Sequence, residues 1–128
     1  MIYNDNVHQA AQAIVILNYR DITMSDIIEQ LENTISENPI ILFMKGTPDF
    51  PQCGFSMRTA QALKACDVEF VYVDVLAAPE VRRNLPSVSN WPTFPQVFVN
   101  GELIGGCDIV LEMYQTGELK TVLEQAGA

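Results

Sequence analysis

Cys53 is the residue whose type and position most clearly point to chemistry. It begins the run Cys53-Gly54-Phe55-Ser56, between a loop rich in glycine and proline and a predicted helix. Free N–H groups and the positive end of the helix dipole favour a thiolate at such a position. A redox dithiol motif would carry its second cysteine three residues on, where this chain has Ser56. Cys53 therefore has two candidate chemistries, attack on the disulfide of another molecule or ligation of a metal, with an inert buried cysteine as the alternative.

Three basic residues form candidate anion contacts. Lys45 follows the apolar run Ile40 to Met44 at its carboxyl end, the region where open α/β sheets bind ligands. Arg82 and Arg83 lie on a predicted short helix, and guanidinium groups fit carboxylates well. Solvated surface side chains are the alternative for all three.

The run from Trp91 to Gln96 carries a second signal, because Pro95 directly precedes a predicted strand. A proline there is a candidate for a cis peptide bond, and the backbone of Phe94 is then free to pair with an extended peptide. An ordinary proline-rich turn with trans bonds is the alternative.

Gly105-Gly106-Cys107-Asp108 opens a later predicted helix. Successive backbone N–H groups at a helix start can bind a carboxylate, and the Asp108 side chain can receive an ammonium group. As an alternative, Asp108 stabilises the first turn of its own helix. Cys66, within a predicted helix, is assigned to core packing.

Composition narrows the function classes. The chain has 128 residues, of which 48% are hydrophobic, and a formal charge of −9. The length and hydrophobic content suit one globular domain. The negative charge argues against binding of nucleic acid, because phosphate groups are bound by clustered Lys and Arg. Three cysteines form an odd, sparse set, so we expect reduced thiols and a cytoplasmic protein. No sufficiently long apolar run predicts a membrane span, and no signal peptide is evident.

The predicted elements alternate and place these motifs at the ends of strands and helices. We expect a domain over residues 24–128, preceded by an extension over 1–23 in which Ala10 to Leu17 has helical spacing. Ser25 or Asp26 would cap the first helix. A mixed sheet of four strands with helices on both faces follows from the order of the elements, which are helices at 27–37, 54–66, 79–85, 107–115 and 118–125 and strands at 40–44, 69–73, 96–99 and 102–104.

Taken together, these motifs resemble those of bacterial single-domain monothiol glutaredoxins of the Cys-Gly-Phe-Ser class. The resemblance spans roughly residues 25 to 126 and leaves the extension outside. It implies a thioredoxin-like fold, a cis bond before Pro95 and a glutathione site. The motifs that carry it are Lys45-Gly46-Thr47-Pro48, Cys53-Gly54-Phe55-Ser56, Trp91-Pro92-Thr93-Phe94-Pro95-Gln96 and Gly105-Gly106-Cys107-Asp108.

The resemblance also implies which residues bind glutathione. Cys53 would lie beside the glutathione thiol. The remaining contacts run along the tripeptide, with Lys45 and Arg82 at the glycine carboxylate, Phe94 at the cysteinyl backbone, and Cys107 and Asp108 at the γ-glutamyl end.

A [2Fe–2S] cluster takes four ligands as a rule, and Cys53 with one glutathione thiol supplies half of them. Two such half-sites facing across a two-fold axis supply the rest. Members of the family are implied to work in this way, as homodimers that carry a cluster to iron–sulfur apo-proteins, often with BolA-like partners. We therefore expect a carrier that binds glutathione and a [2Fe–2S] cluster, with Cys53 as the metal ligand from each subunit and with no membrane or nucleic-acid partner.

The rival function is a glutathione-dependent thiol–disulfide oxidoreductase. Cys53 would be the nucleophile that removes glutathione from mixed disulfides, and a second glutathione would resolve the adduct, so Ser56 does not forbid it. The long loop before Cys53 is associated in the family with cluster binding, which favours the carrier. Whether the protein is an enzyme stays open at this stage, and a thioredoxin-like binding module without a cluster is the third alternative.

Overall fold

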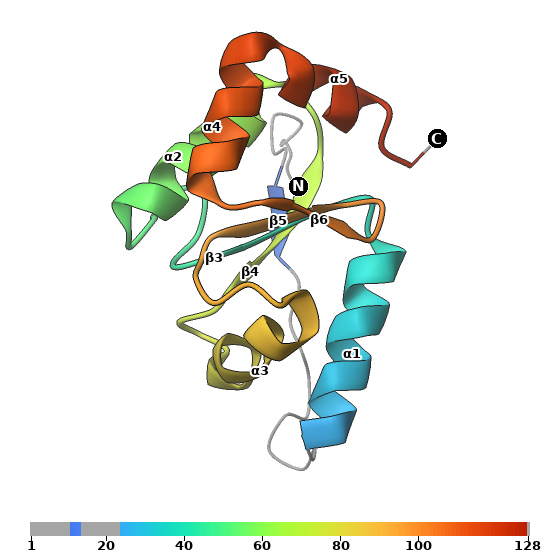
Figure 1. Cartoon of the computed structure of the whole chain (residues 1–128). Coiled ribbons are helices and arrows are strands. Elements are labelled where there is room, and N and C mark those ends of the chain that lie inside the picture. Colours follow the sequence, from blue (N-terminus) through green and yellow to red (C-terminus); the bar gives the residue numbers. More distant parts are fainter. Residues whose placement is uncertain (1–10, 14–23, 128) are drawn as a thin grey trace, which may run out of the picture.

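A single mixed β-sheet lies between two layers of helices (Figure 1). The computed structural model describes residues 11–13 and 24–127. In chain order the elements are β2 (Ala11–Ala13), α1 (Met24–Glu37), β3 (Ile40–Met44), α2 (Gly54–Ala65), β4 (Phe70–Asp74), α3 (Pro79–Ser89), β5 (Gln96–Val99), β6 (Glu102–Gly105), α4 (Cys107–Thr116) and α5 (Glu118–Glu124).

The sheet has the strand order β2-β4-β3-β5-β6, with β3 at its centre. β3 runs parallel to β4 and antiparallel to β5, and β4 in turn pairs in parallel with β2. β5 and β6 form a hairpin closed by Asn100 and Gly101, which both have positive φ (51° and 84°) as the favoured two-residue turn requires.

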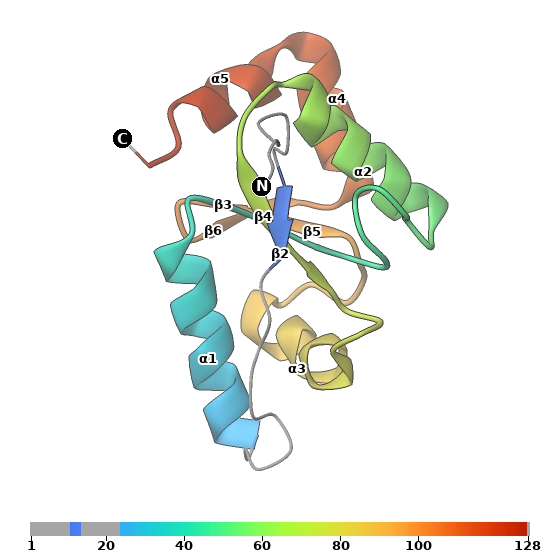
Figure 2. The same cartoon turned by 180° about the vertical axis from the view of Figure 1, so that it is seen from behind.

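Alternate side chains of β3 enter two separate cores, which explains why this strand is apolar throughout. Ile40, Leu42 and Met44 pack with side chains of α2, α4 and α5, which cover one face of the sheet. Ile41 and Phe43 pack with side chains of α1 and α3 on the opposite face (Figure 2). The sheet is thus held from both sides, and the carboxyl end of β3 is fixed firmly in place.

The predicted fold class is confirmed, and so is the order of the elements from residue 24 onward, with boundaries that shift by a few residues. α3 continues to Ser89 instead of ending at Leu85, with Pro86 inside the helix although proline disfavours that position. α1 begins at Met24, so Ser25 and Asp26 lie within its first turn and the predicted cap was wrong. In the described part of the chain, no helix combines the length and apolar character needed to cross a membrane.

The sheet has five strands, and the prediction of four was wrong. The additional strand is β2, which lies in the region where apolar spacing predicted a short helix. Ala11 to Ala13 instead pair with Phe70 to Tyr72 of β4, because the exposed edge of β4 offers backbone hydrogen bonds that spacing does not reveal. The rest of the predicted helix lies outside the described residues. The domain boundary near Met24 stays a prediction.

Candidate functional site

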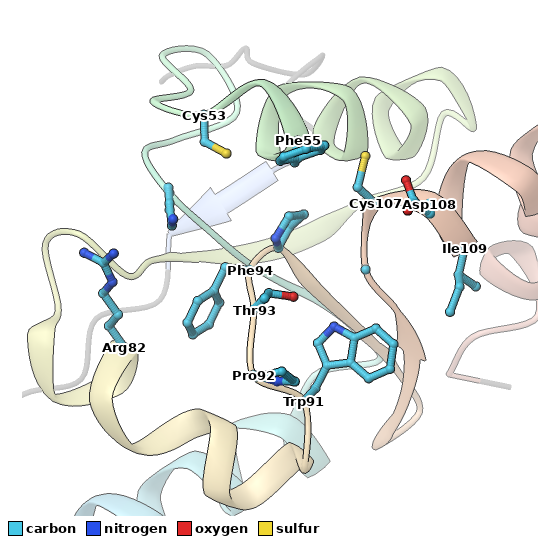
Figure 3. A pocket seen from close by; sticks show the side chains of 13 residues that line it. Cys53, Phe55, Arg82, Trp91, Pro92, Thr93, Phe94, Cys107, Asp108 and Ile109 are labelled. Atoms are coloured by element: carbon cyan, nitrogen blue, oxygen red, sulfur yellow. The ribbon is translucent and has the colours of Figure 1, made fainter.

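An open cavity of about 730 Å³ lies at the carboxyl end of β3, where the starts of α2 and α4 meet the segment before β5. The six residues that the resemblance assigns to a glutathione site all line it. Figure 3 shows Cys53 near the start of α2, with Arg82 on one side and Cys107 and Asp108 on the other. The lining consists of Lys45, Cys53, Phe55, Arg82, Trp91, Pro92, Thr93, Phe94, Pro95, Gly106, Cys107, Asp108 and Ile109.

Cys53 occupies the N-cap position of α2 with extended backbone angles, and its carbonyl accepts the N–H of Met57 at 2.9 Å. The pKa of Cys53 is lowered from the ordinary thiol value, most strongly by the backbone N–H of Ser56. The Phe55 N–H, the Ser56 hydroxyl and the charge of Lys45 act in the same direction, while burial opposes them. Cys53 is therefore a half-buried thiol whose thiolate form is favoured, as its position in the sequence predicted.

Ser56 joins the end of β3 to the first turn of α2. The residue is completely buried, and its Oγ accepts the backbone N–H of Lys45 at 3.1 Å. The sequence identified Ser56 only as the place where a second cysteine is missing. In the structure its hydroxyl both fixes Lys45 and favours the Cys53 thiolate, two roles that a residue pattern does not display.

The loop before Cys53 is held in one conformation by contacts at Gly46. Gly46 has a φ of +91°, and a Cβ there would lie 2.6 Å from the carbonyl oxygen of Phe50. Its N–H donates to Asp74 Oδ1 at 2.9 Å, and the N–H of Gln52 donates to the Lys45 carbonyl at 3.0 Å. Asp74, which sequence reasoning missed, thus connects β4 to the start of this loop and helps to position Lys45.

Lys45 and Arg82 are the cations of the cavity. Neither forms an ion pair within the described residues. Arg83, the next residue on α3, is instead paired with Glu80 and does not line the cavity. In a chain with a formal charge of −9, two unpaired cations beside one thiol mark a local site for an anion. Of the two candidate arginines, the structure selects Arg82.

The segment before β5 presents an unpaired backbone to the cavity. The Phe94–Pro95 peptide bond is cis, as predicted. Within the described residues, no hydrogen bond involves the N–H or C=O of Phe94, so both are available to an extended ligand. The neighbouring Gln96 is completely buried, and its Nε2 donates to the carbonyls of Trp91 (2.9 Å) and Thr93 (3.0 Å).

The start of α4 forms the remaining wall. Gly106 is the N-cap, no side chain caps the helix by a hydrogen bond, and Asp108 lies in the first turn, where its charge also favours the helix. Asp108 is exposed and Cys107 is buried in the wall of the cavity. The first-turn N–H groups of a helix attract a carboxylate, and Asp108 adds a nearby group that attracts an ammonium. This wall therefore suits a ligand end that carries both charges.

The described residues provide no complete metal site. No group of three or more His, Cys, Asp or Glu side chains is arranged there to hold a metal ion. All three cysteines are free thiols. Cys66 is buried in the core between α2 and α5, and burial raises its pKa, which confirms its assignment to packing.

Three large apolar side chains close to Cys53 in the sequence are exposed. Phe50, at the tip of the preceding loop, is 75% exposed, and Phe55 and Met57 in the first turns of α2 are 55% and 40% exposed. Large apolar side chains grouped around a reactive residue are typical of a surface that a partner covers.

Comparisons with known proteins agree with this geometry. The family profile described as Glutaredoxin matches residues 40–104. The chain is 55% identical over 105 residues to Glutaredoxin 4 of Escherichia coli (strain K12), a match that covers 82% of this chain and 91% of that protein. Reduced poplar apo GrxS14 has 41% identity and a TM-score of 0.69, covering 81% of this chain and 96% of that one. A buckwheat glutaredoxin–glutathione complex shares the fold at 23% identity, with a TM-score of 0.71 and coverage of 82% and 94%.

Proposed function

Because the chain belongs to the glutaredoxin family, we propose that it is a monothiol glutaredoxin that binds glutathione and carries a [2Fe–2S] cluster as cargo. The observation that carries this proposal is the setting of Cys53. Its thiolate is favoured, it opens onto a cavity with two unpaired cations, and Ser56 stands where a local disulfide partner would be. Because this chain offers only one such thiolate, the second thiol that the chemistry needs comes from another molecule.

In this proposal glutathione lies along the cavity, from Lys45 and Arg82 to Asp108. Lys45 and Arg82 supply the two positive charges for the glycine carboxylate. The unpaired backbone of Phe94 suits the cysteinyl peptide unit. The uncapped start of α4 suits the carboxylate of the γ-glutamyl end, and Asp108 suits its ammonium group. The family resemblance implies these contacts, and the charges and unpaired groups of this chain suit them.

Cys53 would supply one of the four cluster ligands, and the thiol of bound glutathione would supply a second. A second copy of the chain, facing the first across the cluster, would supply the other two. Phe50, Phe55 and Met57, which lie within four residues of Cys53 in the sequence, are exposed and available for such a copy to cover. Ligands held only by non-covalent contacts are released readily, which suits transfer of the cluster to iron–sulfur apo-proteins. We include a BolA-like protein among the proposed partners.

Anaerobic reconstitution with iron, sulfide and glutathione tests the proposal. We expect a coloured dimer with one cluster per pair of chains, and no cluster when glutathione is left out. Cys53→Ser should abolish the cluster, whereas Cys66→Ala, which alters a buried core thiol, should retain it. A colourless monomer from the unaltered protein would refute the carrier function. A stable cluster in Cys53→Ser would show that another residue is the ligand.

The lowered pKa of Cys53 also supports a second function, reduction of glutathione mixed disulfides. The Cys53 thiolate would attack the glutathione sulfur of a mixed disulfide and release the other thiolate. A second glutathione would then attack the Cys53 adduct, regenerate the thiolate and leave as oxidised glutathione. Rapid turnover of a glutathionylated peptide by the cluster-free protein, lost in Cys53→Ser, would favour this function over cluster carriage.

A further inference from the structure

One buried side chain organises the wall of the cavity between α3 and β5. Gln96 is completely buried, and its Nε2 donates to the carbonyls of Trp91 and Thr93. The carboxamide can make both contacts in only one orientation, because its NH₂ group donates to carbonyl oxygens and its own oxygen would repel them. Gln96 thereby holds two peptide units of the segment in a fixed direction.

The direction of these two carbonyls determines what the cavity receives. With the carbonyls of Trp91 and Thr93 bonded to Gln96, the next residue, Phe94, keeps its N–H and C=O free of partners within the described residues. These are the groups assigned above to the cysteinyl backbone of glutathione. Gln96 touches no part of the proposed ligand, but it sets the conformation of the residues that do.

The same segment also contacts the opposite wall. A Cβ placed on Gly106 would lie 3.3 Å from Trp91 Nε1 and 3.2 Å from the Pro95 carbonyl oxygen. The indole of Trp91 therefore packs directly against the backbone at the start of α4. Figure 3 shows the Trp91 ring on the α4 side of the cavity, below Cys107. Because Gln96 fixes the carbonyl of Trp91, it also helps to fix the indole that packs against the start of α4.

Two polar atoms of this arrangement gain no hydrogen bond. Gln96 Oε1 and Trp91 Nε1 are buried and have no partner within the described residues. Unpaired buried polar atoms lower stability, so Gln96 Oε1 and Trp91 Nε1 offset part of what the two Nε2 hydrogen bonds contribute. The direct effect of the glutamine is to fix the positions of the Trp91 and Thr93 carbonyls.

We propose that Gln96 is a positioning residue for the tripeptide site, which sets the Phe94 backbone through Thr93 and the start of α4 through Trp91 in their ligand-binding geometry. This inference rests on the proposed binding of glutathione. It states that Gln96 raises the affinity for glutathione although its side chain does not touch the ligand.

Gln96→Met tests the inference, because methionine has nearly the same length and volume but cannot donate. Titration of the apo protein with reduced glutathione, followed by NMR, gives the dissociation constant of the folded fraction, and a thermal melt gives stability. We expect an affinity lower by about fivefold or more, with shifted amide signals of Phe94 and Gly106. The pKa of Cys53 should stay unchanged, since its causes lie in Phe55, Ser56 and Lys45. Gln61→Met, at an exposed position of α2, is the matched control and should bind normally.

Wild-type affinity in Gln96→Met, with only a lower melting temperature, would overturn the inference and leave Gln96 a packing residue. If Gln96→Met does not fold, Trp91→Phe decides, because it keeps an aromatic ring but removes the indole edge that contacts Gly106. Weaker binding in Trp91→Phe together with a shifted amide signal of Asp108 supports the coupling between the two walls, because Trp91 also lines the cavity, and weaker binding without that shift, or unchanged binding, refutes it. Absence of glutathione binding by the unaltered protein would instead refute the proposed function, and this inference with it.

Discussion

Replacing Ser56 by alanine removes the one side chain that joins the end of β3 to the start of α2. The Oγ of Ser56 accepts the N–H of Lys45 at 3.1 Å, in a residue with no exposed surface. No other hydrogen bond to this N–H exists within the described residues. Ser56→Ala therefore leaves a partly buried donor unpaired and removes a hydroxyl that favours the Cys53 thiolate.

The expected loss of stability follows from the unpaired donor. Leaving a buried donor unsatisfied costs about 1–3 kcal/mol. The Lys45 amide is only partly buried, so the lower half of this range applies, about 1–2 kcal/mol, or a melting temperature lower by about 4–8 °C. The pKa of Cys53 should rise but stay below the ordinary thiol value, because the Ser56 backbone N–H, the largest cause of its lowering, remains.

Thermal unfolding and a pH titration of the thiolate absorbance measure the two effects on the same variant. Ser36→Ala is the matched control, since Ser36 is exposed on α1 and its hydroxyl contacts only its own helix, at the Asn33 carbonyl. The control should change stability by less than about 0.5 kcal/mol. A Ser56→Ala variant that is as stable as the control and has an unaltered Cys53 pKa would refute the role assigned to this serine.

Three further outcomes are expected. Gly46→Ala should lower the free energy of unfolding by about 3 kcal/mol, because the added Cβ would meet a backbone atom at 2.6 Å and the residue has a positive φ. Gly101→Ala has a positive φ but open space around it, so it should lower the free energy by only about 1 kcal/mol. Equal losses of the two variants in denaturant melts would contradict this difference. Arg82→Ala should weaken glutathione binding about fivefold by calorimetry, and Arg83→Ala, whose side chain pairs with Glu80, should not. Since the Cys53 pKa is lowered by folding, its thiolate stabilises the fold above the unfolded thiol pKa of about 8.5, and this contribution disappears as pH falls through the lowered pKa. The stability gap between wild type and Cys53→Ser should therefore narrow as pH falls, and a gap that widens would argue against a lowered pKa.

Much of the fold could be predicted because its signals are local. The continuous apolar run of β3 indicated a strand buried on both faces, and Asn100-Gly101 indicated the hairpin turn. The strand Ala11–Ala13 could not be predicted, since its three residues gain their structure from pairing with β4, far away in the sequence. Tertiary pairing of this kind overrides a spacing that is typical of a helix.

The residues that line the cavity could be identified from the sequence, whereas the residues that fix their positions could not. Cys53, Lys45 and Asp108 stand at ends of elements, where a single sequence shows that a ligand can reach. Asp74 and Gln96 act through hydrogen bonds from side chain to backbone, and Asp74 reaches across 28 positions of the chain. Such bonds have no period or motif, so only the folded geometry reveals them.

In the proposed function, Cys53 and an external glutathione together hold the cluster. The mass of the reconstituted protein under non-denaturing conditions, measured with and without glutathione, tests this joint ligation. We expect a dimer that contains one [2Fe–2S] cluster and two glutathione molecules, and a cluster-free monomer when glutathione is absent. A cluster-bound species without glutathione would show that glutathione is not a ligand.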